Sequence, residues 1–181
     1  MNIVTIDNDK LWSKRQKNLL LGSWCINNKH RYQKSKKKNY LISDYHWNDK
    51  LKFKNDLKYL YKIYNLFLNN LSLNLNTFHS SKHPTRYWEI LLSTWLWTYI
   101  VMVFDRWEII KTIKKNNKNF SIKAFNYDMK NFTPSDGYEF IASQAFSDDW
   151  NHWIYSKILK SQTNTNFHYI NKKKNPTEIF L

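Results

Sequence analysis

The stretch DKLKFKNDLKYLYKIYNLFLNNLSLNLNTF, residues 49–78, says most about the fold of this chain. Its apolar side chains recur every three or four residues, which is typical of one face of a long helix. They are Phe53, Leu57, Leu60, Tyr64, Phe67, Leu71, Leu75 and Phe78. Asn48 and Asp49 lie where an N-cap and an acidic first turn belong. We therefore predict a helix from about Asp49 to Thr77.

A second helix is predicted directly afterwards, from near Thr85 to Lys115. Pro84 suits its first turn, where the missing N–H costs nothing, and Lys114 and Lys115 complement the negative end of its dipole. Its middle, 90–104, carries no charge and is apolar almost all round. We expect this part at the centre of the domain, with the two helices forming an antiparallel hairpin.

Short apolar runs on either side of the hairpin predict strands. They are Leu19–Leu21, Tyr40–Ile42 and Phe120–Phe125. A Thr cap at Thr133 predicts a short helix, and Ser147 with two following acids predicts another as far as Lys160. The fold class that we predict is α/β and mostly helical, with a small parallel sheet and a long helix hairpin. We expect a polar lead-in over 1–17, one domain over 18–160 and a loose polar tail over 161–181.

The net charge of +15 comes from 29 basic and 14 acidic residues, and 25 of the 29 bases are Lys. Lys, Asn, Ile, Tyr and Phe share codons rich in A and T, so genome composition explains much of this excess. A protein that reads bases or holds phosphates in a bidentate manner would use more Arg. We expect no nucleic-acid partner and at most weak contact with a membrane surface.

Cys25 is the single cysteine, so no internal disulfide can form. We expect a cytoplasmic protein, because a reducing compartment suits such a chain. The 15 uncharged residues of 90–104 are fewer than the ~20 of a membrane span. A buried helix is the preferred interpretation, and a helix lying at the membrane interface is the alternative.

No strong catalytic or phosphate-binding motif occurs, and only two glycines are present. His79 and His83 have the spacing of two ligands on one helix face, but Pro84 disfavours helical geometry at His83. No third ligand lies nearby in sequence. We therefore predict that the chain has no metal site. His83 stays a candidate base beside a helix N-terminus.

Three clusters combine aromatic and titratable residues. Tyr45–Asp49 contains His46, a candidate base, and Asp49, a candidate orienting acid. Arg86, Trp88 and Glu89 open the second helix, and Arg106 lies beyond its uncharged middle. Asp149 and Asn151 open the last helix. Buried ion pairs that fix the hairpin explain these charges as well as a ligand site does.

Sugars stack on aromatic faces while their hydroxyl groups bond to acids and amides. A cleft that combined these clusters would suit a carbohydrate. The candidate catalytic residues are His46, His83 and Asp49. The candidate substrate-binding residues are Arg86, Trp88, Glu89, Arg106, Asp149 and Asn151.

From Leu19 to Lys160 the chain resembles the N-terminal region of a family of transferases associated with O-antigen and surface-polysaccharide genes in bacteria. The resemblance rests on LLLGSWC at 19–25, DYHWNDK at 44–50, LNTFHSSKHPTRYWEILL at 75–92, FDRWE at 104–108 and DDWNHWIYSKIL at 148–159. The chain departs from the family at Ser93-Thr94, where a Gly-Pro pair is usual, and at Pro84, where Ser is usual. Both departures bear on helix shape more than on charge.

The resemblance implies the acceptor-side or structural half of a two-domain glycosyltransferase-like protein that works on surface polysaccharide at the inner face of the membrane. A carbohydrate acceptor and a second, C-terminal domain on a separate chain are the implied partners. The resemblance also implies that a nucleotide-sugar binds only together with that second domain, so no cofactor is expected here and this chain alone should be inactive. Two other functions stay open: a basic helical module that binds nucleic acid, and a peripheral membrane protein anchored by the Trp-rich helix.

Overall fold

The computed structural model describes residues 1–26, 39–116, 119–162 and 165–171. Its base is a five-stranded, all-parallel sheet with the order β3-β2-β1-β4-β5. The strands are β1 (Asn2–Val4), β2 (Asn18–Leu20), β3 (Tyr40–Ile42), β4 (Ser121–Phe125) and β5 (Asn166–Ile170). The sheet begins at its centre with β1, grows to one side through β2 and β3, and then continues on the other side with β4. Ligands commonly bind at the carboxyl ends of the strands in sheets with such a reversal.

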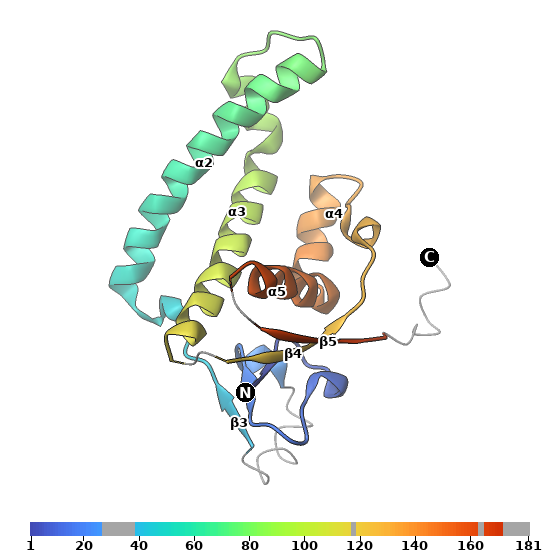
Figure 1. The fold of residues 1–181 in the computed structure, drawn as a ribbon. Helices are drawn as coiled ribbons and strands as arrows, with labels where there is room; N and C mark the ends of the chain where they lie inside the picture. Colours follow the sequence, from blue (N-terminus) through green and yellow to red (C-terminus); the bar gives the residue numbers. More distant parts are fainter. Residues whose placement is uncertain (27–38, 117–118, 163–164, 172–181) are drawn as a thin grey trace.

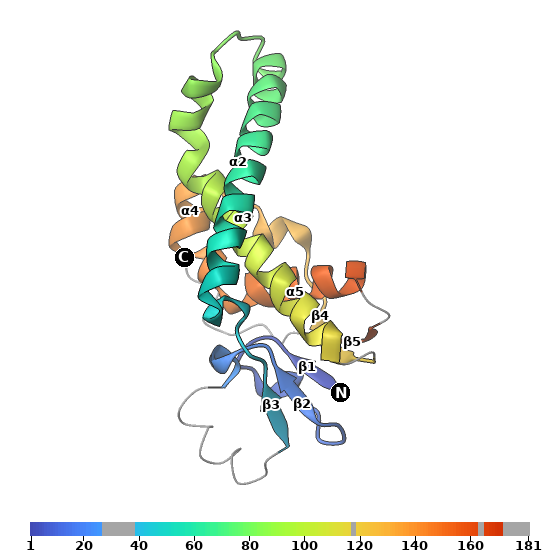
Figure 2. The ribbon, with the colours of Figure 1, turned by 90° about the vertical axis from the view of Figure 1, so that its left-hand side faces the viewer.

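Between β3 and β4 the chain forms a hairpin of two long helices, α2 (Lys50–Phe78) and α3 (Thr85–Asn116). The hairpin projects away from the sheet in both ribbon views (Figures 1 and 2). Asp49 caps α2 by accepting hydrogen bonds from the backbone N–H groups of Leu51 and Lys52. The two predicted helices and their antiparallel arrangement are thus confirmed to within a residue at most ends.

Two shorter helices complete the domain, α4 (Gly137–Ala142) and α5 (Asp148–Gln162). Figure 1 shows α5 lying against β4 and β5. The predicted Ser147 start of α5 is confirmed, because the Ser147 hydroxyl accepts a hydrogen bond from the N–H of Trp150. The predicted Thr133 cap is wrong: α4 begins later, and Asp136 caps it by accepting from Glu139 N–H.

Five short 3-10 turns connect these elements. They are Asp9–Leu11, Ser23–Cys25, His46–Asn48, Met129–Phe132 and Gln144–Phe146. The second and third follow β2 and β3, so each turn begins where its strand leaves the sheet. They bring Trp24 and the segment around Tyr45 to the edge of the sheet.

Apolar side chains form two separate clusters. The larger one fills the base, where the sheet meets α5 and the lower half of α3, and contains Ile3, Leu20, Ile110, Ile122 and Trp150. The smaller one joins the two helices of the hairpin to each other through Leu60, Tyr64, Leu68, Leu96 and Ile100.

Three expectations need correction. The polar lead-in of 1–17 contains β1, which is buried because it is the central strand. The loose tail of 161–181 contains β5, while 172–181 lie outside the described residues. The middle of α3 is not at the domain centre, because Ile90 and Leu91 are 67% and 59% exposed.

Candidate functional site

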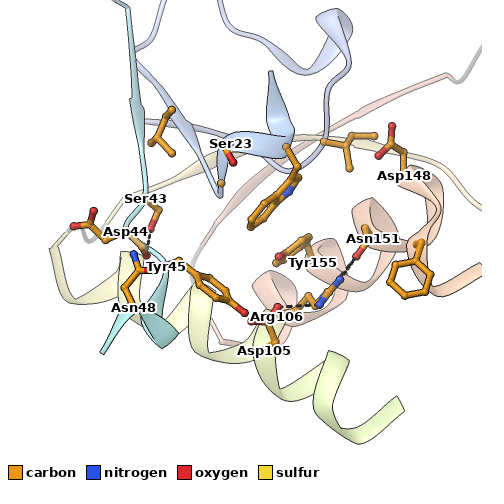
Figure 3. A pocket seen from close by; sticks show the side chains of 15 residues that line it. Ser23, Ser43, Asp44, Tyr45, Asn48, Asp105, Arg106, Asp148, Asn151 and Tyr155 are labelled. Atoms are coloured by element: carbon orange, nitrogen blue, oxygen red, sulfur yellow. Dashed lines mark hydrogen bonds and ion pairs between the residues drawn. The ribbon is translucent and has the colours of Figure 1, made fainter. Parts of the chain in front are cut away.

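A pocket of about 510 Å³ opens at the carboxyl ends of β1, β2 and β3 (Figure 3). Ile6 follows β1, Gly22 to Trp24 follow β2, and Ser43 to Tyr45 follow β3, so three neighbouring strands supply one wall. The opposite wall comes from α3 and α5. The site therefore occupies the sheet edge at which parallel α/β folds commonly bind ligands.

The turn after β2 places an indole at this pocket. Trp24 is 45% exposed, and its Nε1–H donates to the carbonyl of Thr5 at 3.1 Å. Its ring also lies against Gly22, where an added Cβ would come within 2.0 Å of the ring carbons. The glycine is needed for close approach, and the indole is held with much of its surface open to solvent.

Arg106 lies in the pocket and joins its two helices. Its guanidinium donates two hydrogen bonds, of 3.1 and 2.8 Å, to Oδ1 of Asn151 on α5. It donates a third, of 2.9 Å, to Oδ2 of Asp105, as Figure 3 shows. The sequence predicted Arg106 and Asn151 as substrate-binding residues, and the structure brings these two together in one pocket.

His46 lies behind the pocket and supports Asp105. The imidazole is 1% exposed, and its Nε2 is 3.0 Å from Asp105 Oδ1. Because a carboxylate only accepts, this nitrogen carries the proton. Burial raises the pKa of Tyr45, and the neighbouring Asp105 carboxylate raises it further. The candidate base His46 therefore does not line the pocket. It bonds to the carboxylate of Asp105, which does line it.

Asp44 and Asp148 are two further acids in the pocket wall. Burial raises the pKa of Asp148, and the negative charges of Asp149 and Asp7 raise it further. A carboxyl group with a raised pKa in a pocket is a candidate for proton transfer. In the sequence Asp148 is only the first acid after the Ser147 helix start, and the structure places it in the pocket.

Asp49, a candidate catalytic residue, and Asp149, a candidate substrate-binding residue, are engaged in local structure. Asp49 caps α2, and Asp149 accepts a 2.9 Å hydrogen bond from the Tyr127 hydroxyl. Neither side chain lines the pocket.

The four remaining candidates lie at the tip of the hairpin. The His83 ring stacks on Tyr87 with centroids 4.0 Å apart, and Trp88 Nε1–H donates to Asn76 Oδ1. Arg86 and Glu89 form the pair that their spacing predicted, at 2.8 Å. The pair is not buried, however, because the Arg86 side chain is 73% exposed. The structure does not bring these residues to the pocket.

Several pocket residues were missed for a common reason. The sequence gives no sign that four of the pocket residues lie together, because they come from three separate segments that meet only at the sheet edge. These residues are Trp24, Ser43, Asp44 and Tyr155. A usable signal for Trp24 and Asp44 is their position just after the predicted strands Leu19–Leu21 and Tyr40–Ile42. Tyr155 on α5 had no comparable signal.

One cluster has the composition of a metal site. Ligand atoms of His46, Asp56 and Glu108 all lie within 4.8 Å of one another. The Lys52 ammonium bonds to both Asp56 and Glu108, and Lys111 bonds to Glu108 as well. Burial opposes the charge on Glu108, but these two lysines lower its pKa overall. The carboxylates are therefore already balanced by lysines.

One helix, Thr85–Lys115, is long and apolar enough to cross a membrane by length and composition. Core helices of soluble proteins pass the same test. In this helix, however, only 22% of its most apolar 18-residue segment is buried.

Comparison with known proteins places the chain in a family. No curated protein and no solved structure shows significant similarity to it. A family model described as LIC12162 family transferase matches residues 1–179. The match confirms the transferase part of the resemblance noted above, while the link to O-antigen is taken up below as a proposal. The chain belongs to the LIC12162 family of transferases.

Proposed function

We propose that this transferase acts on sugars in the assembly of surface polysaccharide, and that the pocket at the sheet edge binds the saccharide acceptor. The observation that carries the proposal is the make-up of this pocket. It combines an exposed indole with carboxylates, a guanidinium group and an amide, at the carboxyl ends of three parallel strands.

These groups match the two kinds of surface that a sugar ring presents, its apolar C–H face and its hydroxyl groups. The C–H face of a pyranose packs on an aromatic ring, and Trp24 offers such a ring in a fixed position. Sugar hydroxyl groups both donate and accept, and the pocket offers acceptors at Asp44 and Asp148 and further N–H donors on the Arg106 guanidinium. An acceptor saccharide could thus be oriented by stacking and by hydrogen bonds at once.

Transfer to a hydroxyl group requires a base to take its proton. We assign this role to Asp148, because its pKa is raised and its side chain faces the pocket. Arg106 would neutralise negative charge that develops near the acceptor. His46 is a positioning residue, because it acts on the pocket only through Asp105.

We expect the donor to be a nucleotide-sugar, and no phosphate-binding turn is assigned to it within the described residues. The reaction would take place in the cytoplasm, at the inner face of the membrane. Cys25 is consistent with that compartment: it is buried, its thiol donates to the Val4 carbonyl, and burial raises its pKa to about 12.

The proposal can be tested by binding alone. A panel of methyl glycosides should give saturation-transfer NMR signals with the wild-type protein, and at least one sugar should bind measurably. Trp24→Ala should abolish that binding. Tyr138→Ala is the matched control, because Tyr138 is an aromatic residue that is 80% exposed and lies outside this pocket. Equal loss in both variants, or no binding by any sugar, would contradict the proposal.

The role of Asp148 needs a separate measurement. Asp148→Asn keeps the shape of the side chain and removes the basic carboxylate, so it should leave sugar binding within about twofold. Transfer, assayed with a nucleotide-sugar and the second domain that the resemblance implies, should fall about 10²–10⁴-fold. Asp128→Asn is a control on an acid that caps the Met129–Phe132 turn outside the pocket. Unchanged transfer in Asp148→Asn would remove Asp148 from the mechanism.

A further inference from the structure

We propose that a groove between α2 and α3 binds the hydrocarbon chain of a lipid-linked acceptor, whose saccharide head reaches the pocket at the sheet edge. This inference rests on the proposed function, because it names the class of acceptor for that pocket. It is carried by the groove itself, by the distribution of charge along the groove, and by the turn of α3 that lines both the groove and the pocket.

The groove has a volume of about 1010 Å³ and runs along one side of the hairpin. Ligand sites for small molecules commonly measure ~300–1,000 Å³ and are mostly apolar. Five large side chains that are exposed to solvent line this one groove. They are Tyr59 at 51%, Leu66 at 57%, Phe67 at 54%, Tyr99 at 39% and Trp107 at 42% exposure.

The groove is charged at one end only. Lys52, Asp56, Glu108 and Lys111 line the end nearest the sheet, and between Ile63 and Asn74 the α2 wall has no charged residue. The facing part of α3, from Trp95 to Phe104, is uncharged as well. Such a slot orients an amphiphile, because the chain lies along the uncharged part and the polar head stays at the charged end.

The charged end suits the linker between chain and sugar. The Lys111 side chain is 56% exposed and can leave Glu108 for an anionic group, while Lys52 is held between Asp56 and Glu108. A phosphate that joins a lipid to a saccharide would find a cation here. This charge complementarity favours a lipid-linked saccharide over a neutral lipid.

The groove and the pocket meet at one turn of α3. Phe104 and Trp107 line the groove, whereas Asp105 and Arg106 line the pocket. His46 lies between the two sites, with Nε2 bonded to Asp105 and Nδ1 4.0 Å from Asp56 Oδ2. The charged end of the groove and the pocket thus lie on two faces of the same turn of α3, with the buried His46 side chain between them.

The groove is concave, which favours a single chain over a flat bilayer. A bilayer would instead need a convex apolar face, such as the tip residues Phe78 and Leu73. We therefore commit to a single amphiphile molecule. A bilayer surface or a second copy of this chain would leave a different pattern in the experiments below.

The test compares dodecyl phosphate and dodecyl β-D-glucoside with methyl β-D-glucoside, all below the concentration at which micelles form. Isothermal titration should show each dodecyl compound binding roughly tenfold or more tightly than the methyl glucoside, because burial of the chain adds affinity. The double variant Leu66→Asn/Phe67→Asn should lose this gain. Leu73→Asn/Phe78→Asn should keep it, because these residues are 66% and 81% exposed on the same helix but outside the groove.

All four substituted side chains are more than half exposed, so both double variants should fold, as circular dichroism can check. Equal losses in the two variants, or no gain from the dodecyl chain, would overturn the groove proposal. Vesicle flotation that depends on Leu66 and Phe67, without binding of single amphiphiles, would assign the groove to a bilayer and also overturn it. A dimer seen by ultracentrifugation in the wild type and lost in the groove variant would do the same in favour of a second copy.

The same experiments separate this proposal from the proposed function. Suppose that the dodecyl compounds bind and need the groove residues, whereas binding of methyl glycosides does not depend on Trp24. This result would support the groove proposal and contradict the saccharide site. Sugar binding that needs Trp24, with no gain from the chain, would leave the saccharide site standing and remove the groove proposal.

Discussion

Both halves of α3 contain large apolar side chains, but the surroundings of these side chains differ. In the half next to the sheet, Ile109, Ile110 and Ile113 are at most 3% exposed and belong to the core of the base. In the half toward the tip, Ile90 and Leu91 are more than half exposed, and the helix packs mainly against α2. An apolar helix is therefore not evidence of burial along its whole length.

The difference follows from the number of partners. A helix that meets a sheet and a second layer of helices can bury all its sides, whereas a helix in a two-helix hairpin has one neighbour. The side that faces away from α2 must stay exposed or meet something else.

The largest effect that we expect contrasts the two halves directly. Ile110→Ala should lower the free energy of unfolding by about 2–5 kcal/mol, because it leaves a cavity in the packed base. Ile90→Ala should change it by less than about 0.5 kcal/mol, because Ile90 is largely exposed. Urea denaturation followed by fluorescence measures both, and similar losses would contradict the contrast.

The second effect is a dependence of the free energy of unfolding on pH, which we expect to come from a histidine near the sheet and not from the hairpin tip. His152 is fully buried: Phe125 N–H donates to its Nε2, and its Nδ1 is 2.6 Å from the Thr5 hydroxyl. Burial lowers its pKa from 6.5 to about 4, although Asp149 opposes the change. Between these values the unfolded chain binds a proton that the folded protein does not, so stability falls as pH falls. From pH 7 to pH 5 this loss is about 2 kcal/mol.

The variant His152→Gln should flatten this pH dependence, whatever its effect at neutral pH. His83→Gln is the control, because its exposed ring at the hairpin tip is far from the base. The free energy of unfolding measured in urea at several pH values gives both slopes. A slope that is the same in wild type and His152→Gln would show that another group is responsible.

The hairpin was predictable because its signal is local. A repeat of three and four residues persists through α2, and Asp49 and Pro84 mark helix starts in the sequence itself. β1 was missed because it has only three residues, one of them Asn2. Asn2 is buried all the same, since its side chain donates to the Leu11 carbonyl and to Asn18 Oδ1. β5 alternates polar and apolar residues at the edge of the sheet, so it resembled a tail.

The candidate site was predictable only in part. Arg106 and Asn151 were chosen for their residue type, and they do meet, although 45 residues separate them. Arg86 and Glu89 were chosen for the same reason and lie at the tip instead. Residue type suggests which side chains can bind a ligand, but the sheet edge decides which of them converge, and that information is not local.

A third prediction compares these two arginines. Arg106→Ala should lower the free energy of unfolding by about 1–3 kcal/mol, because Asp105 is 6% exposed and loses its cationic partner. Arg86→Ala should leave the urea midpoint unchanged within error, because the Arg86–Glu89 pair is exposed to solvent. A larger shift for Arg86→Ala would show that the tip is more tightly packed than the base around Arg106.

The smallest effect on stability concerns the chain's two glycines, one at the site and one outside it. Gly22→Ala puts a methyl group where the Trp24 ring now lies, but a half-exposed indole can turn outward. It would then lose its hydrogen bond to Thr5, which is worth about 1 kcal/mol. Gly137→Ala is the control, because its Cβ would come within 3.2 Å of the Trp95 Cβ and touch no part of the pocket.

If the pocket depends on a fixed indole, Gly22→Ala should abolish sugar binding as fully as Trp24→Ala, while Gly137→Ala leaves it unchanged. Retained sugar binding in Gly22→Ala would mean that the position of the indole is not what orients the ligand.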